Sequence, residues 1–355
     1  MSWVLAFLGF ALLVILHEAG HFAAAKAVGM RVERFSLFFP PLLARVRRGE
    51  TEYAVGAVPL GGYVKITGMN PAERIPPEVA ARAYFRQPVW KRVVVIVAGP
   101  AVNIVLAFAI LWGLFLANGT SEPPPRVGSV ERGTPAATAL RPGDTILAID
   151  GRRPTGSDLK AQEDSVVQAI SAHKGTPVHL TVRRGTQTLT FAVKPFFDRT
   201  PKIRRYRIGF VPMGTDRPAG PVRAVGLSLD TMWRVTSGTV STIAGILTPE
   251  KRKEISGVVG SYETTRQAFQ LDTTVALQLL ALISLSLGVV NLFPFLPLDG
   301  GHIFWALAEK LRGRAIPFSV MERAGFVGFA LVITLFVIGF TNDIGRLTGE
   351  GFRVR

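Results

Sequence analysis

Four long apolar stretches dominate the pattern of hydrophobic and polar positions along this chain. They cover residues 3–28, 93–117, 273–293 and 324–340, the last with a few residues before it. A helix needs about 20 apolar residues to cross a bilayer, and each stretch approaches or exceeds that length. The pattern therefore predicts a multi-pass α-helical membrane protein with four transmembrane helices.

A shorter, punctuated pattern follows the first span. Residues 32–68 indicate strands and turns, and residues 51–66 (TEYAVGAVPLGGYVKI) combine Val and Tyr with Gly and Pro. Such punctuation favours a sharply bent β-hairpin. The segment is too polar to span a bilayer, but it can enter the membrane where other parts of the protein satisfy its backbone. Residues 70–90 predict a loop or a short helix.

A compact α/β pattern follows the second span, after a proline-rich linker at residues 122–125. Turn signals separate its expected elements, which are strands at residues 145–150, 178–183 and 188–193 and a helix at residues 157–172. Residues 221–270 predict amphipathic helices and loops that lead back to the membrane. We therefore divide the chain into a membrane core at 1–117, an α/β domain with its linker at 118–200, a helical and loop region at 201–270, and the rest of the membrane core at 271–355.

The net charge of +16 adds an orientation to this picture. Lys and Arg gather between the first and second spans and between the third and fourth, so the positive-inside rule makes both loops cytoplasmic. Both termini and residues 118–270 then lie on the outer side. The basic residues show no interleaved aromatic pattern, and we therefore expect no nucleic-acid binding. The lack of cysteine excludes disulfides, thiolate metal ligands and a cysteine nucleophile.

The first apolar span carries charged and polar residues that are costly in hydrocarbon. His17 and His21 are four residues apart, so on a helix they share one face and can both reach one Zn²⁺. Glu18 lies beside them, where it can accept a proton from a metal-activated water. An unpaired carboxylate inside the bilayer costs about 2.5 kcal/mol or more. A zinc site that uses Glu18 therefore explains this pattern better than two core or capping histidines with an incidental glutamate.

A catalytic zinc needs a third protein ligand and one open position. Asp299 is the best candidate, because the depth of its segment matches that of the histidines. At 1.5 Å per residue, His17 lies about 21 Å from the outer end of the first span, and Asn291 lies about 27 Å from that of the third. His302 is an alternative ligand, although a capping or supporting role suits it better. For Asp299 itself, an ordinary turn or a helix cap stays open.

Together these motifs resemble the site-2 protease family of intramembrane metalloproteases, in its bacterial branch of the regulator of sigma-E protease type. The resemblance covers nearly the whole chain. It rests on HEAGH at 17–21, GGYVK at 61–65, AGPAVN at 98–103, a PDZ-like core at 133–154 and the segment 291–302. It implies one extracytoplasmic PDZ (α/β) domain, a membrane-associated β-hairpin region and a location in the bacterial inner membrane.

The resemblance also implies roles for the residues of the site. His17, His21 and Asp299 are expected to bind Zn²⁺, and Glu18 is expected to act as the general base. The implied activity is that of a zinc-dependent metalloendopeptidase, with its active site near the cytoplasmic side of the bilayer.

The same resemblance implies a substrate class and partners. The expected substrates are single-pass membrane proteins already trimmed by an upstream site-1 protease, such as anti-sigma factors, and signal-peptide remnants. Asn291 is expected to hold the substrate near the metal. The hairpin is expected to receive the substrate as an added strand. The hairpin residues concerned are Gly61, Gly62 and Tyr63.

Two other functions fit parts of this pattern. A membrane scaffold with a PDZ domain and a vestigial metal site would have no need of an intact Glu18. A metal transporter would need polar residues along a path across the whole membrane, whereas the acidic and histidine residues here lie near one face. For the PDZ domain, a filter that excludes bulky substrates is favoured over capture of a C-terminus by a loop at residues 125–128.

Overall fold

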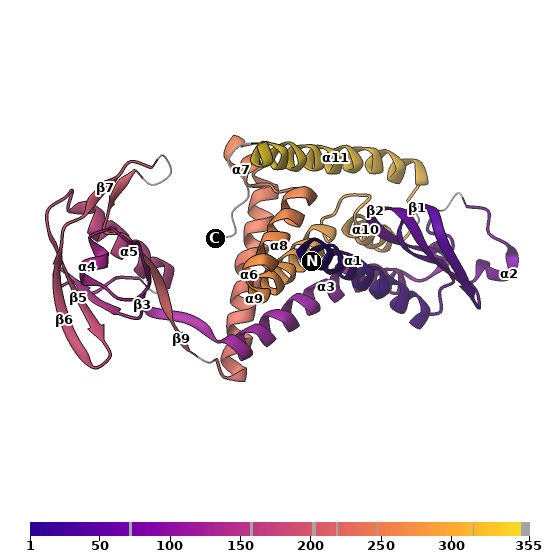
Figure 1. Ribbon diagram of the computed structural model, residues 1–355. Coiled ribbons are helices and arrows are strands. Elements are labelled where there is room, and N and C mark those ends of the chain that lie inside the picture. The colour runs from indigo at the N-terminus through magenta and orange to yellow at the C-terminus, as the bar shows by residue number, and fades with distance from the viewer. Residues whose placement is uncertain are drawn as a thin grey trace. The chain divides into compact units, whose positions relative to one another are not determined.

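The computed structural model describes residues 1–70, 73–156, 159–200, 204–217, 219–246, 248–314 and 316–348 (Figure 1). Two compact units make up the chain. Unit 1 comprises Met1–Gly113 and Val225–Arg355, and unit 2 comprises Leu114–Ala224. The two ends of the chain thus build one unit, and the middle of the chain builds the other.

Among the described residues, four helices are long and apolar enough to cross a membrane, and they coincide with the four predicted spans. They are α1 (Ser2–Ala27), α3 (Val89–Asn118), α9 (Thr273–Asn291) and α11 (Phe318–Thr348). The start of α9 is capped by Asp272, whose side chain accepts a hydrogen bond from the Thr274 backbone N–H. Local capping and apolar length therefore agree on where this helix begins.

Shorter or more polar helices accompany these four. α6 (Pro221–Ala244), α7 (Pro249–Glu254) and α8 (Val258–Leu271) confirm the helices and loops predicted at residues 221–270. A short α2 (Pro77–Ala80) and the 3-10 helix η1 (Tyr84–Arg86) occupy the segment predicted as loop or short helix. α10 (Asp299–Arg312) ends at Gly313, whose φ of +70° gives the left-handed cap conformation that glycine adopts readily.

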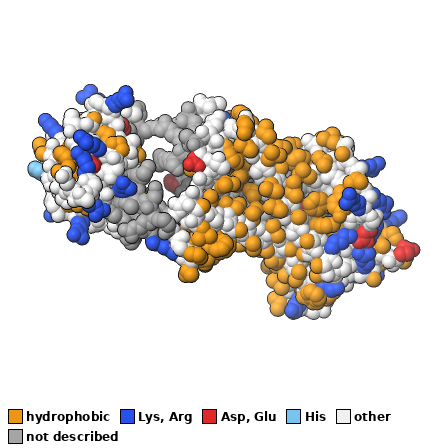
Figure 2. All heavy atoms as spheres, turned by 60° about the horizontal axis from the view of Figure 1, so that its bottom comes forward, with side chains coloured by type: hydrophobic (Ala, Val, Ile, Leu, Met, Phe, Trp, Pro, Cys, Tyr) orange, Lys and Arg blue, Asp and Glu red, His pale blue; other side chains and the backbone are white. Residues whose placement is uncertain are grey.

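The outer surfaces of the long helices are strongly apolar. On α11, Phe326 and Val327 are 69% and 71% exposed, and Trp90 on α3 is 58% exposed. Figure 2 shows hydrophobic side chains as a broad face over the helices of unit 1, with Lys and Arg gathered at the end that carries the sheet. Soluble proteins rarely expose such a large apolar face, and acyl chains of a bilayer would cover it.

β1 (Val32–Arg48) and β2 (Thr51–Ile66) form a sheet in which each strand bends sharply. Residues 34–37 of β1 pair with residues 62–65 of β2 and also with residues 52–55, while residues 44–48 pair with residues 51–55. β1 bends near Pro40 and Pro41, which lack the N–H groups that a ladder needs. No other described strand joins this sheet, so residues 62–66, here called the edge strand, lie along one open edge.

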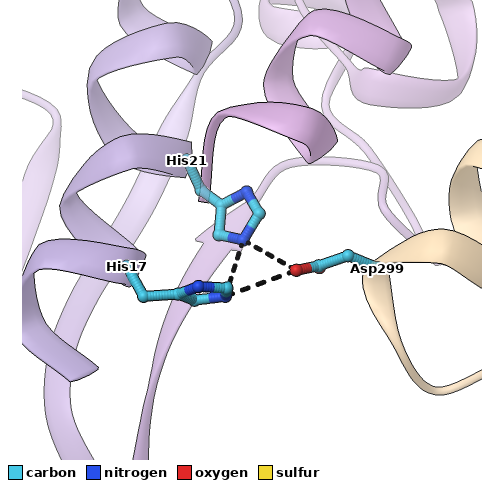
Figure 3. A group of neighbouring side chains, drawn as sticks. All are labelled: His17, His21 and Asp299. Carbon is cyan, nitrogen blue, oxygen red and sulfur yellow. Dashed lines mark hydrogen bonds and ion pairs between the residues drawn. The ribbon is translucent and has the colours of Figure 1, made fainter. Parts of the chain in front are cut away.

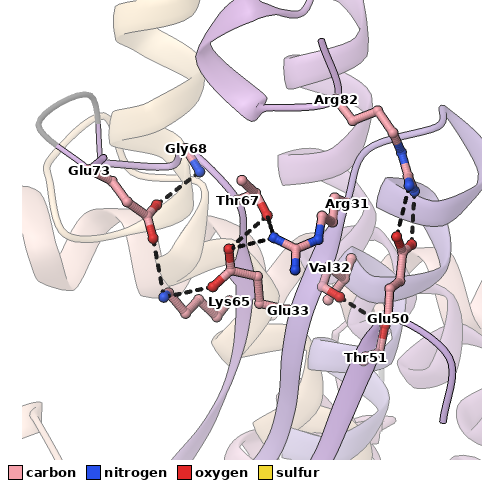
Figure 4. A network of polar contacts seen from close by, with 10 residues as sticks. All are labelled: Arg31, Val32, Glu33, Glu50, Thr51, Lys65, Thr67, Gly68, Glu73 and Arg82. Atoms are coloured by element: carbon pink, nitrogen blue, oxygen red, sulfur yellow. Dashed lines mark hydrogen bonds and ion pairs between the residues drawn. The ribbon is translucent and has the colours of Figure 1, made fainter. Parts of the chain in front are cut away.

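A polar network fixes the base of this sheet (Figure 4). The Nζ atom of Lys65, near the end of the edge strand, lies 2.7 Å from the Oε2 atom of Glu33 on β1. Glu50, in the turn between the strands, accepts hydrogen bonds from Arg82 at 2.7 and 2.8 Å and from Lys26 of α1 at 2.6 Å. The Arg82 guanidinium, together with Lys26, lowers the pKa of Glu50 to about 2. These charged contacts anchor the sheet to α1 and thereby fix where the edge strand lies.

Unit 2 is built on a five-stranded sheet with the strand order β6-β5-β4-β3-β9. The strands are β3 (Thr120–Val130), β4 (Thr145–Ile149), β5 (Val178–Arg184), β6 (Gln187–Val193) and β9 (Phe210–Arg217). α4 (Ala136–Ala139) and α5 (Leu159–Ala172) share a buried apolar core with the sheet. β7 (Phe196–Asp198) and β8 (Arg205–Arg207) form a separate two-stranded sheet.

The predicted strands and helix of unit 2 are confirmed, although residues 157 and 158 lie outside the described residues. The unit nevertheless extends beyond the boundary expected at residue 200, because β9 pairs with β3 and completes the sheet. The linker expected at residues 122–125 is part of β3. Its pairing with β9 skips from Glu122 to Arg126, because the prolines between them have no N–H group to donate.

Residues 125–128, the loop of the alternative in which the domain captures a C-terminus, lie within β3. The Val127 N–H donates to Asp144 O, and Gly143 N–H donates to Val127 O, both at 2.7 Å. A hollow of about 270 Å³ lies elsewhere in unit 2, between α5 and residues 205–212. Val167 and Ile170 of α5 line one side of it, and Phe210 lines the other.

Candidate metal centre

α1 presents two buried histidines on one face. His17 and His21 are one helical turn apart, and their Nε2 atoms lie 3.3 Å from each other. The two rings meet edge to face, with an interplanar angle of 83°. Both ring nitrogens therefore point at the same small space beside the helix.

Asp299 reaches this space from the C-terminal half of the chain. α9 ends at Asn291, the segment that follows contains Pro294 and Pro297, and α10 begins at Asp299. Figure 3 shows the Asp299 side chain pointing from α10 at the two histidines of α1. Its Oδ2 atom lies 3.3 Å from Nε2 of each histidine.

The three converging atoms fit a zinc ion. Tetrahedral zinc, with bonds of about 2.0–2.1 Å, holds neighbouring ligand atoms about 3.3–3.4 Å apart, and all three separations here are 3.3 Å. Asp299 Oδ2 is buried and has no hydrogen-bond partner among the described residues. Converging lone pairs of this kind are stabilised by a cation. Two histidines and one carboxylate leave a fourth coordination position open, as catalytic zinc sites do.

Glu18 lies close to both the ligand residues and the edge strand. It follows His17 on α1, and the Val64 backbone of the edge strand lies near its carboxylate. A Cβ atom added at Gly62 would lie 3.0 Å from Glu18 Cγ. The edge strand therefore passes directly beside Glu18, which neighbours the metal ligand His17 along α1.

α3 packs behind the histidines and supports the centre. His21 Nδ1 donates to the Val95 carbonyl at 2.8 Å, which leaves the ring's lone pair on Nε2. Gly99 makes room for this ring, because a Cβ atom there would lie 2.2 Å from His21 Nε2. One turn before Val95, Arg92 donates to both carboxylate oxygens of Glu309 on α10 at 2.9 Å each. This partly buried pair ties α3 to the helix that begins with the third ligand.

The remaining candidates from the sequence lie around this centre. Gly62 and Tyr63 belong to the edge strand, and Gly61 precedes it against the ring of Phe39. The Tyr63 ring stacks on Phe39 at 5.9 Å. Asn291 is the last residue of α9 and is half-buried.

His302 is not part of the converging group. Among the described residues, the only such group of potential ligands consists of His17, His21 and Asp299. His302 lies one turn further along α10 than Asp299.

Sequence reasoning missed the supporting role of α3. It treats Arg92 as a topology signal and Gly99 only as part of a family motif, whereas the structure pairs Arg92 with Glu309 and packs Gly99 against His21. A small residue within an apolar span is itself a signal, because it permits close approach of another helix. The sequence pattern does not indicate which residue packs against Gly99.

Comparisons with known proteins point to one family. The family model of Peptidase family M50 matches residues 5–335. A protein of Rhizobium meliloti (strain 1021) named "Putative zinc metalloprotease" is 32% identical over 362 residues, which cover 95% of each chain. Proteins with the same description occur in Nostoc sp. (30% identical; 99% of this chain and 98% of the relative) and in Clostridium perfringens (31%; 97% and 98%).

A solved structure also matches part of the chain. It is the PDZ domain of an SdrC-like protein from Listeria monocytogenes, which is 24% identical. The match covers 25% of this chain and 85% of that domain, with a TM-score of 0.21.

Proposed function

We propose that this chain, which belongs to Peptidase family M50 and is a zinc metalloendopeptidase, cuts single-pass membrane proteins within or beside their transmembrane segments. One observation carries the proposal. The ligand atoms of His17, His21 and Asp299 converge beside Glu18, in a unit whose helices are long and apolar enough to cross a bilayer. Such a site is suited to cutting a peptide that is itself in the membrane.

The proposed location is the bacterial inner membrane. The exposed apolar faces of the long helices support embedding in lipid, because water would solvate them poorly. The basic loops after α1 and after α10 favour a cytoplasmic position for both, which puts unit 2 and both termini outside. The metal centre then lies in the cytoplasmic half of the bilayer.

In the proposed mechanism, His17, His21 and Asp299 hold the zinc ion. Bound zinc supplies a Lewis acid, which lowers the pKa of water and polarises the carbonyl that is cut. Glu18 accepts the proton of the attacking water and delivers it to the leaving amine. The low exposure of the two histidines keeps bulk water away from the reacting groups.

The edge strand is proposed to receive the substrate. A helix protects its carbonyl groups with hydrogen bonds, so the substrate segment has to become extended before it is cut. The open edge at Gly62 and Tyr63 offers backbone groups that replace the lost hydrogen bonds. Gly61 gives access to this edge, and Asn291 is proposed to hold the extended segment near the metal.

Proteins already trimmed by an upstream site-1 protease, including anti-sigma factors, are the proposed substrates, together with signal-peptide remnants. Unit 2, through its PDZ-like segment at residues 133–154, is proposed to act as a filter against bulky outer domains. Its attachment at both ends to the membrane core supports this role.

Zinc content and cleavage of a single-pass substrate, measured on the full-length protein in detergent, test the proposal. His17→Ala, His21→Ala and Asp299→Ala should lose zinc and cleavage together, because each removes a ligand. Glu18→Gln should keep its zinc and lose at least about 100-fold in rate, since general-base catalysis contributes about 10²–10⁴-fold.

His302→Ala is the matched control, because this residue lies one turn from the third ligand without joining the group. It should keep full zinc content. If His302→Ala loses zinc while Asp299→Ala retains it, the proposed third ligand is wrong. If Glu18→Gln cleaves at the wild-type rate, the proposed base is wrong.

A further inference from the structure

Asn103, on α3, lies behind His17 on the side away from the metal centre. Its side chain is fully buried, at 0% exposure. Its Nδ2 atom lies 3.3 Å from His17 Nδ1. Its Oδ1 atom is buried and has no hydrogen-bond partner among the described residues. A buried amide oxygen without a partner is costly, and it calls for an explanation.

The tautomer of His17 supplies that explanation. If Nε2 of the neutral ring offers its lone pair to zinc, the proton of the ring is on Nδ1, and that nitrogen must donate. An amide NH₂ group facing Nδ1–H would put two donors against each other. A half-turn of the Asn103 amide exchanges its oxygen and nitrogen, and which of the two faces His17 follows from the hydrogen bond that the ring requires. The oxygen then accepts from the Nδ1–H of His17, and the amide NH₂ group takes the former place of the oxygen.

We propose that Asn103 is a positioning residue that accepts the Nδ1–H of His17 and so holds the Nε2 lone pair of His17 on the metal. The inference rests on the proposed zinc site. It gives His17 the same kind of support that His21 receives from the Val95 carbonyl. α3 thereby holds both histidines at the ring nitrogen that faces away from the metal.

The surroundings of Asn103 favour positioning over substrate contact. Ser284 of α9, which is fully buried, donates its hydroxyl hydrogen to the backbone carbonyl of Asn103 at 3.0 Å. Gly288, one turn further along α9, lets that helix close over the site, because a Cβ atom there would lie 3.3 Å from Asn103 Cβ. A side chain enclosed between α3 and α9 in this way cannot touch a substrate, but it can hold a ring rigidly.

The affinity of the full-length protein for zinc, measured in detergent by competition with a chelator, tests the inference. Asn103→Leu keeps the size and removes the acceptor, so zinc binding should weaken about 10–100-fold, the usual effect of losing such a partner. Asn103→Asp keeps an acceptor for Nδ1–H and should bind zinc far more tightly than Asn103→Leu. Val105→Leu is the control, because Val105 lies on the same helix and is 65% exposed. It should bind zinc like the wild type.

The visible spectrum of the cobalt-loaded protein gives a second readout. Asn103→Leu should change the cobalt bands, because an unrestrained His17 ring alters the ligand geometry, and Asn103→Asp should restore them. Wild-type zinc affinity in Asn103→Leu would overturn the inference. Equal weakening in Asn103→Leu and Asn103→Asp would also overturn it, since packing alone would then explain the effect.

Two further measurements keep these outcomes distinct. If Asn103→Leu does not fold, Asn103→Ala takes its place with the same expectation. His17→Ala shows whether the metal site itself exists. If the wild type binds zinc no more tightly than His17→Ala does, the proposed ligand set fails, and the role of Asn103 fails with it.

Discussion

Each histidine of the metal centre is held at both of its ring nitrogens. His17 and His21 point their Nε2 atoms at Asp299, and His21 is fixed from behind by the Val95 carbonyl. Such double support matters because zinc chemistry depends on ligand placement within a few tenths of an ångström. The positions of the two histidine side chains therefore depend on the position of α3, which packs behind them.

Gly99→Ala tests whether the position of the His21 ring depends on α3, because it adds a single methyl group to that helix. The added methyl group would lie 2.2 Å from His21 Nε2, so the ring has to leave its place. Zinc affinity should fall by at least about 10-fold, and cleavage should fall with it. Alanine also stabilises a helix by about 1 kcal/mol relative to glycine, so a weakened helix would not explain the loss.

Gly113→Ala is the matched control for this substitution. It makes the same change on the same helix, and no atom lies within 4 Å of the added methyl group. It should keep wild-type zinc affinity. A Gly99→Ala protein that holds zinc as tightly as Gly113→Ala would show that the His21 ring is free to move without consequence.

The ligands were within reach of sequence reasoning, and their supports were not. His17 and His21 follow from a four-residue spacing, and Asp299 follows from matching depths along two spans. Asn103 carries no such signal, because its partner is set by how α3 packs on α1 and α9. Packing of this kind depends on small residues such as Gly288, whose effect on helix distance cannot be deduced from one sequence.

The edge strand is the element that we propose brings a substrate to the metal centre. Its position depends on a bent sheet whose ends are fixed by ion pairs, including that of Lys65 with Glu33. Lys65 therefore holds the strand in place, although it belongs to the same GGYVK motif as Gly62. The edge of this sheet beside Glu18 is joined by no other described strand, and the proposed substrate segment would pair there.

Gly62→Val tests whether this edge receives the substrate. A Cβ atom at this position would lie 2.9 Å from Ser36 O and 3.0 Å from Glu18 Cγ, so a larger side chain crowds the space beside the base. The zinc ligands are untouched, and zinc content should therefore stay at the wild-type level. Cleavage of a single-pass substrate should fall at least about 10-fold, because docking as an added strand is blocked.

Ala44→Val is the control for Gly62→Val. Ala44 is exposed and lies on the opposite edge of the same sheet, where it pairs with Val55. This variant should cleave normally. If Gly62→Val cleaves as fast as Ala44→Val, the edge strand does not receive the substrate. If Gly62→Val loses zinc, its effect lies in the metal centre and the strand proposal loses this support.

The membrane-spanning helices could be predicted from the length of their apolar stretches, whereas the C-terminal boundary of unit 2 could not be predicted from the sequence. Four spans stand out because a bilayer requires about 20 apolar residues in a row. β9 (FVPMGTDR) contains Pro and Gly, which weaken a strand pattern, and its partner β3 lies far earlier in the chain. Pairing between strands so far apart in the sequence depends on the packed core of the unit. The sequence pattern therefore places the domain boundary at residue 200, before β9.

The chain as a whole combines an apolar face with a basic end. Unit 1 exposes hydrophobic side chains over its long helices, and Lys and Arg gather at the end that carries the sheet (Figure 2). A bilayer would cover the first surface, and the positive-inside rule would put the second in the cytoplasm. A protein placed in this way meets its substrates inside the membrane, which is the central claim of the proposed function.

The position of the cut tests that claim most directly. Zinc-loaded protein is reconstituted into lipid vesicles with a single-pass substrate that carries a short outer tail, and mass spectrometry identifies the new ends of the products. New ends should lie in the cytoplasmic half of the substrate's apolar segment or within a turn of it, and Glu18→Gln vesicles should give no products. Cuts confined to the polar domains of the substrate, or the same products with Glu18→Gln, would contradict the account.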